Sequence, residues 1–146
     1  MVVKMNTAQR RARLAKRHLL TGAHQIAAVS EVADCLVAFH ATDPASVYLS
    51  AFARLPNFAA TELEAALYQE RSLIRMLGMR RTMFVFSREL VPVVQKACTD
   101  EIAEKQRKLL IQHLSQQGYP HNVPEAENWL ASVCDKTAAA VVKRGR

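Results

Sequence analysis

The sequence predicts a mainly helical protein that carries one β-hairpin. Only 4 of its 146 residues are Gly and 5 are Pro, and the stretches between them are rich in Ala, Leu, Glu, Lys, Arg and Gln, which favour helix. Two runs of β-branched, aromatic and long apolar residues, 72–77 and 82–86, flank Gly78 and a basic tip, a pattern typical of a hairpin. A helix followed by a basic hairpin is typical of a winged helix, so we predict a winged helix followed by a helical extension.

The chain starts with a dense run of positive charge. Residues 4–17 contain six Lys and Arg residues and no Asp or Glu, with helical composition throughout. Two interpretations stay open for this arm, residues 1–28: a helix that lies along DNA phosphates through Arg10, Arg11 and Lys16, or a solvated helix face. An Arg-rich start without acidic residues is also typical of an organelle transit peptide, an interpretation that the structured sequence directly after it disfavours.

Three helices are expected before the hairpin, within a winged-helix domain at 29–88. Ser30 is a candidate N-cap for the first, whose apolar residues recur every three or four positions,. Asp43, followed by proline, is a start signal for the second. Thr61, with Glu64 three residues later, forms a capping-box pattern for the third. The order of three helices and then a hairpin is the basis of the fold prediction.

Further helices are expected after the hairpin, in an extension at 89–118. A linker rich in Gly, Pro and Asn then opens residues 119–146. The last helix, from Glu125 to about Lys143, carries an apolar face made of Trp129, Leu130, Val133 and Val141. It lacks the partners that such a helix packs against, so we expect the first helix of a truncated second unit, and self-association through this apolar face.

The charge favours an anionic partner. Net charge is +7, and residues 1–88 hold 12 Lys and Arg against 6 Asp and Glu, whereas 89–146 hold 8 against 7. Duplex DNA is favoured over a membrane, because no long basic amphipathic helix with bulky apolar residues is present. No apolar run approaches the roughly 18 residues of a membrane span, and the start lacks the apolar core of a secretory signal. We expect a cytoplasmic protein.

The sequence disfavours metal and cofactor sites. The three cysteines are far apart and form no CxxC pair, and the five histidines have no metal-ligand spacing,. No GxxxxGK[ST], GxGxxG or GxSxG motif occurs,. We therefore predict no cofactor and no metal.

Arginines cluster around the predicted hairpin. Arg75, Arg80 and Arg81 lie within seven residues without an acidic neighbour between them. Such a cluster is costly unless an anion compensates its charge, which favours DNA contact over a merely solvated tip. Together with the N-terminal arm, the predicted DNA-binding residues are Arg71, Arg75, Arg80, Arg81, Arg10, Arg11 and Lys16.

The run from Val32 to Phe86 resembles a known family, especially in LVAFHATDPASVYLSAFARLPNF and LEAALYQERSLIRMLGMRRTMFV. It is similar to the amino-terminal part of the bacterial winged-helix DNA-binding family that includes the interstrand-crosslink DNA glycosylases (AlkZ-like proteins). Members of that family are more than twice this length. The resemblance implies duplex DNA binding and, in the glycosylase branch, metal-free hydrolysis of the N-glycosidic bond of an alkylated or crosslinked purine.

The resemblance also points to a loop where catalysis can be assessed. In the glycosylase branch it carries Gln, an apolar residue and Gln, and the matching residues here are His40, Ala41 and Thr42. His40 could act as an acceptor or acid, and Asp43 could stabilise positive charge on a sugar. The alternative is that His40 ends a helix and Asp43 caps one. The missing Gln pair leaves DNA binding mainly through phosphates as the leading function, with base excision and a protein-interaction module as alternatives.

Overall fold

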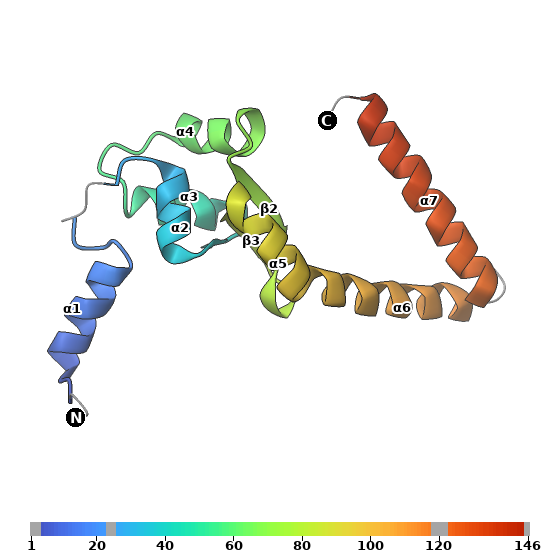
Figure 1. Cartoon of the computed structure of the whole chain (residues 1–146), viewed down its shortest axis with the longest axis horizontal. Helices are drawn as coiled ribbons and strands as arrows, with labels where there is room; N and C mark the ends of the chain where they lie inside the picture. Colours follow the sequence, from blue (N-terminus) through green and yellow to red (C-terminus); the bar gives the residue numbers. More distant parts are fainter. Residues whose placement is uncertain (1–3, 23–25, 118–122, 145–146) are drawn as a thin grey trace. The chain divides into compact units, whose positions relative to one another are not determined.

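The computed structural model describes residues 4–22, 26–117 and 123–144. The chain divides into two compact units, Met1–Thr99 and Asp100–Arg146. Figure 1 labels the helices α1–α7 and the strands β2 and β3. The finer division expected at residues 28, 88 and 118 stays a prediction. No helix within the described ranges is long and apolar enough to cross a membrane.

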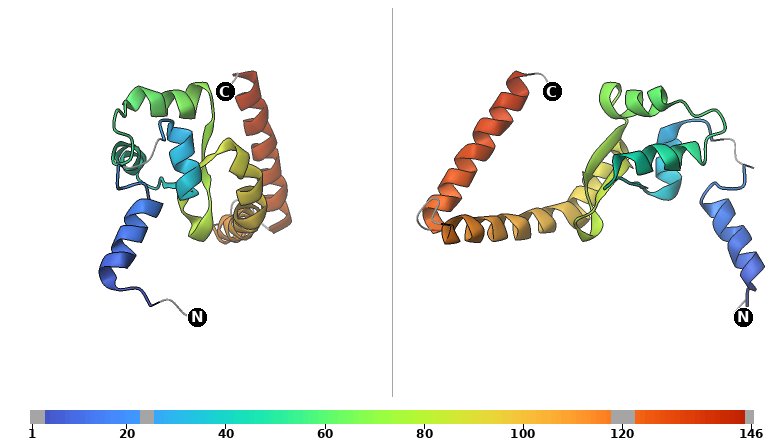
Figure 2. Two further views of the ribbon diagram at one scale, coloured as in Figure 1. Left: turned by 60° about the vertical axis from the view of Figure 1, so that its left-hand side comes forward. Right: turned by 180° about the vertical axis from the view of Figure 1, so that it is seen from behind.

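The first unit has the element order of a winged helix. Its helices are α1 (Thr7–Arg17), α2 (Val29–Leu36), α3 (Pro44–Phe52) and α4 (Ala60–Glu64), the last continuing as a π-helical turn, η1 (Ala65–Gln69). Its strands are β1 (Phe39–His40), β2 (Leu73–Leu77) and β3 (Met83–Ser87). They form an antiparallel sheet in the order β1-β3-β2. Figure 2 shows η1 leading into β2, with the hairpin tip at the far end of that strand. The predicted winged helix is confirmed.

A third strand joins the hairpin, so the expectation that the hairpin is the whole sheet was wrong. In β1, Phe39 pairs with Val85 and His40 with Phe84. The N–H of Ala41 extends this pairing by donating to the carbonyl of Met83 at 2.8 Å. A strand of two residues is too short to produce a readable alternation of apolar and polar residues. Its register depends instead on Phe39, whose side chain is only 1% exposed.

The core lies between the helices α2, α3 and α4 and one face of the sheet. The helical periodicity expected from the sequence is visible here, since the buried residues of α2 recur every three or four positions,. The fully buried members of this cluster include Val32, Ala33, Leu63, Leu73 and Val85.

Two of the three predicted helix caps were wrong. Asp43 does cap α3, because its carboxylate accepts a hydrogen bond from the N–H of Ala45 at 3.2 Å. Ser30 and Thr61 instead lie inside α2 and α4, which begin one residue earlier after alanines that make no side-chain cap bond. Burial fixes the start of α2, since its first residue, Val29, is only 5% exposed.

The helix α2 also ends earlier than expected. It stops at Leu36, and the following Val37 has a φ of 73°, which a β-branched residue rarely adopts. This reversal directs the chain into β1. The expectation that His40 ends a helix was therefore wrong, since His40 is a strand residue.

The hairpin is followed by one more helical segment of the first unit. It consists of η3 (Arg88–Leu90), α5 (Val91–Val94) and η4 (Gln95–Thr99). Its last residue, Thr99, contacts the hairpin, since its hydroxyl donates a hydrogen bond to the carbonyl of Leu77 at 2.7 Å.

The second unit consists of α6 (Asp100–Gln116) and α7 (Val123–Lys143), which pack against each other. Ile111 and Ala126 are buried there. Most of the predicted linker lies outside the described residues. Pro124 does not belong to a linker but to the first turn of α7, where proline is tolerated.

The tip of the hairpin is a tight turn occupied by arginines. The N–H of Gly78 donates to the carbonyl of Thr82 at 2.9 Å, and the N–H of Thr82 donates to that of Met79 at 3.1 Å. Between them, Arg80 and Arg81 both have a φ of 57°. Two consecutive positive φ values are typical of a type I′ turn, which favours Asn-Gly. The left-handed conformation costs other residues roughly 1 kcal/mol or more each.

Replacing Arg80 with Asn and Arg81 with Gly should stabilise the hairpin. We expect the free energy of unfolding of the first unit to rise by about 1–2 kcal/mol, because the new residues adopt positive φ without strain. Hydrogen exchange of the β2 and β3 amides measures this unit directly, whereas the fluorescence of Trp129 would report the second unit. The control R80K/R81K keeps the strain and should change nothing. Equal protection in R80N/R81G and the native chain would contradict the turn assignment.

Candidate nucleic-acid interface

The hairpin tip presents two cationic side chains at the surface. Arg80 and Arg81 are both exposed, and the neighbouring Met79 is 53% exposed. The turn between Gly78 and Thr82 fixes their backbone. A methyl group on Gly78 would lie 3.1 Å from the ring of Phe84 and 3.2 Å from that of Phe86, so only glycine allows these rings to support the tip so closely.

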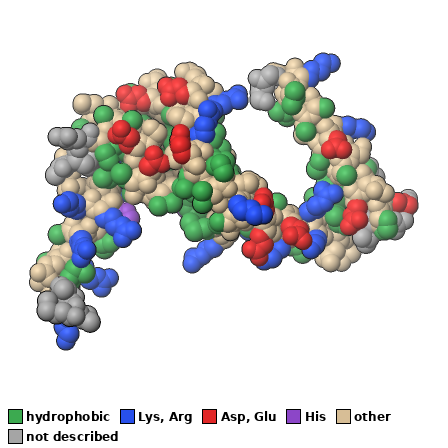
Figure 3. Space-filling model, in the orientation of Figure 1, with side chains coloured by type: hydrophobic (Ala, Val, Ile, Leu, Met, Phe, Trp, Pro, Cys, Tyr) green, Lys and Arg blue, Asp and Glu red, His purple; other side chains and the backbone are tan. Residues whose placement is uncertain are grey.

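A second cationic surface lies on α1. The helix is stabilised by a reciprocal cap, in which Asn6 accepts from the N–H of Gln9 at 2.8 Å and the Gln9 side chain accepts from the N–H of Asn6 at 3.0 Å. The predicted contacts Arg10, Arg11 and Lys16 are all exposed. Figure 3 shows Lys and Arg side chains gathered over this helix.

The end of α1 is anchored to α3 by Arg54. Its Nε donates to the carbonyl of His18 at 2.9 Å and its Nη1 to that of Ser50 at 2.8 Å. Burial lowers the pKa of the Arg54 guanidinium. The adjacent Leu19 enters the core cluster. The positive charges of α1 are thus held by the same unit that carries the wing.

The helix that meets the major groove in many helix-turn-helix proteins is acidic here. Along α4 and η1, the exposed charged residues are Glu62, Glu64 and Glu70, and a cation follows only at Arg71. Figure 3 shows Asp and Glu side chains over this part of the molecule. Such a surface repels phosphates, so the wing and α1, rather than α4, have the charge for contact with the DNA backbone.

The arginines at the base of the hairpin differ from those at its tip. The guanidinium of Arg75 donates to the carbonyl of Ala41 through Nε at 3.2 Å and Nη2 at 2.9 Å. Three of the five N–H donors of a guanidinium are not used by this contact. Arg71 is exposed and has a φ of 54°. DNA contact by either residue stays a prediction.

The structure places the three candidate catalytic residues next to one another at the end of β1. His40 is exposed and stacks edge-on against Phe84, with ring centroids 5.6 Å apart. Thr42 is exposed in the following loop. The carboxylate of Asp43 is engaged by the start of α3, since the Ser46 hydroxyl also donates to it at 3.3 Å. This geometry accounts for Asp43 as a helix cap, and a catalytic role for the three stays a prediction.

Sequence reasoning missed a surface groove between η1 and β2. It has a volume of about 440 Å³ and is lined by Tyr68, Arg71, Arg75 and apolar residues of η1 and the hairpin. A smaller cavity of about 70 Å³ shares Tyr68 and Arg75 and adds Tyr48 of α3. Burial raises the pKa of the Tyr48 hydroxyl, and the charges of Glu64 and Tyr68 raise it further. The signal for this groove in the sequence was an aromatic residue, Tyr68, directly beside the apolar stripe of Leu63, Ala66 and Leu67.

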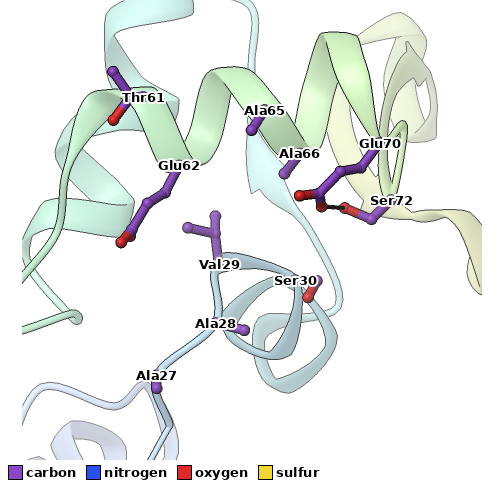
Figure 4. A pocket seen from close by; sticks show the side chains of 10 residues that line it. All are labelled: Ala27, Ala28, Val29, Ser30, Thr61, Glu62, Ala65, Ala66, Glu70 and Ser72. Carbon is purple, nitrogen blue, oxygen red and sulfur yellow. Dashed lines mark hydrogen bonds between the residues drawn. The ribbon is translucent and has the colours of Figure 1, made fainter.

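Another cavity, of about 420 Å³, lies between the start of α2 and the helix α4–η1. Figure 4 shows Glu62 and Glu70 at its wall, with Glu70 accepting a hydrogen bond from the Ser72 hydroxyl at 3.5 Å. Among the described residues, no Lys or Arg lines it. Its charge makes it unsuitable for a phosphate.

Over the described ranges, no group of His, Cys, Asp and Glu side chains is arranged to hold a metal ion.

Residues 33–146 match the family model described as DNA glycosylase AlkZ-like. No curated protein and no solved structure matches the chain. The family match covers most of the chain and extends through both units, beyond the run that carries the resemblance in the sequence. The chain therefore belongs to the AlkZ-like DNA glycosylase family.

Proposed function

We propose that this chain binds duplex DNA mainly through its phosphates. Family membership implies DNA interaction. The observation that supports the mode is the distribution of charge in the first unit: exposed arginines lie on the wing tip and α1, whereas the charged residues of α4 are exposed glutamates. Guanidinium groups bind phosphate oxygens, and backbone contacts of this kind carry little sequence information.

The wing tip should contribute about two phosphate contacts. Replacing Arg80 and Arg81 together with Glu should flatten the slope of log affinity against log salt by about 2 units, because two fewer counterions are released on binding. The measurement is fluorescence anisotropy of a labelled duplex over a range of salt concentrations.

Two further double variants separate charge from folding. R80K/R81K keeps both positive charges and should keep the slope, whereas R80N/R81G should lose the contacts although its hairpin is the more stable one. An unchanged slope in folded R80E/R81E would show that the phosphate contacts are not made by the wing tip. Arg10, Arg11 and Lys16 on α1 would then be the surface to mutate.

Base excision is the second candidate function, and the family match favours it. The loop of His40, Ala41 and Thr42 carries no glutamine at either position where the resemblance predicts one. The Asp43 carboxylate is already used by two donors of α3. Hydrolysis of a glycosidic bond needs a positioned water and charge stabilisation beside the sugar. We infer that these residues provide neither at a useful level.

The chain should accordingly release no alkylated purine above background. The assay incubates excess protein with methylated and with crosslinked duplex, followed by alkaline cleavage of abasic sites. H40A and D43N are the diagnostic variants, and Asn at position 43 still caps a helix. Strand breaks that disappear in either variant while DNA binding survives would make excision the leading function.

We also propose self-association through α7. Its exposed apolar residues include Val133, Val141 and Val142, which are 36%, 46% and 78% exposed. Leu130, Val133 and Val141 recur at helical spacing and share one face. Exposed apolar faces of this kind favour association.

Sedimentation should therefore show a molar mass that rises with protein concentration. V133E/V141E should abolish this rise, because charges on the apolar face oppose its burial. A139E adds a charge to the opposite face of α7 and should leave the rise unchanged. A constant monomer mass for the native chain would rule out this surface as an oligomer interface.

A further inference from the structure

We propose that the groove between η1 and β2 binds one unpaired nucleotide, with Tyr68 stacking on the base and Arg71 contacting its phosphate. The proposal rests on the DNA binding proposed above and adds a specific ligand to it. The groove is lined by Tyr68, Arg71, Arg75, Leu67, Ile74 and Met83.

The exposure of Tyr68 is the first step of the argument. Its side chain is 71% exposed, although it belongs to a helix whose neighbouring residue Ala66 is buried. The π-helical turn at Ala65–Gln69 contains this tyrosine. Turns of this kind are frequent at functional sites. An exposed aromatic ring at the wall of a groove is the standard platform for a nucleobase in single-stranded recognition.

The conformation of Arg71 is the second step. It follows η1 and has a φ of 54°, which glycine or asparagine would adopt at lower cost,. Arg80 and Arg81 at the wing tip share this conformation. Residues in strained backbone conformations cluster at active sites and ligand clamps. An arginine kept at such a position beside an exposed tyrosine fits the phosphate that accompanies a stacked base.

The shape and polarity of the groove are the third step. Its volume of about 440 Å³ lies within the range of roughly 300–1,000 Å³ for small-ligand sites. The floor is apolar, with Leu73 fully buried, as the face of a base requires. The adjoining cavity near Tyr48 and Pro44 is also lined by Tyr68 and Arg75.

The groove is also connected to the loop that holds the candidate catalytic residues. Arg75 lines the groove and donates two hydrogen bonds to the carbonyl of Ala41. Ala41 lies between His40 and Thr42. An unpaired nucleotide in the groove would therefore lie against the side chain that fixes this loop.

The test is a double-mutant cycle between the protein and the DNA. The native chain and Y68A are titrated with a duplex carrying a single-nucleotide bulge, and with the same duplex whose bulge is an abasic analogue. Removing the ring or the base should each weaken binding about tenfold. Removing both should weaken binding little more than removing one. Y68F keeps the ring and should bind the bulge within twofold of the native chain. Thermal unfolding confirms that both variants fold.

A fully matched duplex is the reference. Y68A should bind it as the native chain does. Three outcomes would overturn the nucleotide site and leave phosphate binding intact. The effects of removing the ring and the base could be independent, the native chain could show no preference for the bulge, or Y68A could weaken binding of matched DNA equally. Absence of binding to every duplex would overturn both proposals. Replacement of Arg71 by Gln should weaken binding of both bulged duplexes, and no effect of R71Q on either would remove it from the site.

Discussion

The hydrogen bonds of the backbone N–H and carbonyl of Ala41 are the contacts on which the winged helix depends. The N–H donates to Met83 of β3, and the carbonyl accepts from the guanidinium of Arg75 on β2. Ala41 is fully buried, and a buried backbone group without a partner costs about 1–3 kcal/mol. These bonds extend the pairing of β1 with β3 by one residue and join the chain between β1 and α3 to both strands of the hairpin. The fold of the first unit and the loop of the candidate catalytic residues thus depend on the same hydrogen bonds.

Charge is distributed in a way that reverses the usual role of the helices in a helix-turn-helix unit. The recognition helix carries glutamates, whereas the arginines lie before and after it in the chain. Phosphates are contacted wherever cations lie on the surface, and the sequence of DNA is read only where side chains enter a groove. This charge distribution supports the proposed contact with phosphates at the wing and α1 rather than at α4.

The sequence was sufficient for features that depend on local patterns. Three helices followed by a basic hairpin, and the cap formed by Asp43, all follow from periodicity and turn chemistry. The strand β1 was not predictable, because it depends on pairing with residues more than 40 positions away. The same limit applies to Arg75, whose side chain lies on the carbonyl of Ala41 rather than at the hairpin tip. Tyr68 was overlooked because helical sequence does not reveal a π-helical turn.

That turn has a consequence for how proteins with this architecture can diverge. A π-helical turn holds one residue more than the α-helical turn it replaces. Loss of one residue within Ala65–Gln69 would rotate the residues between the deletion and β2 by about 100° around the helix axis, relative to the buried Leu63. Tyr68 and Arg71 would then leave the groove together, while the core of the sheet stayed in place. Insertion and deletion, rather than substitution, are thus the changes that can switch this surface in a single event.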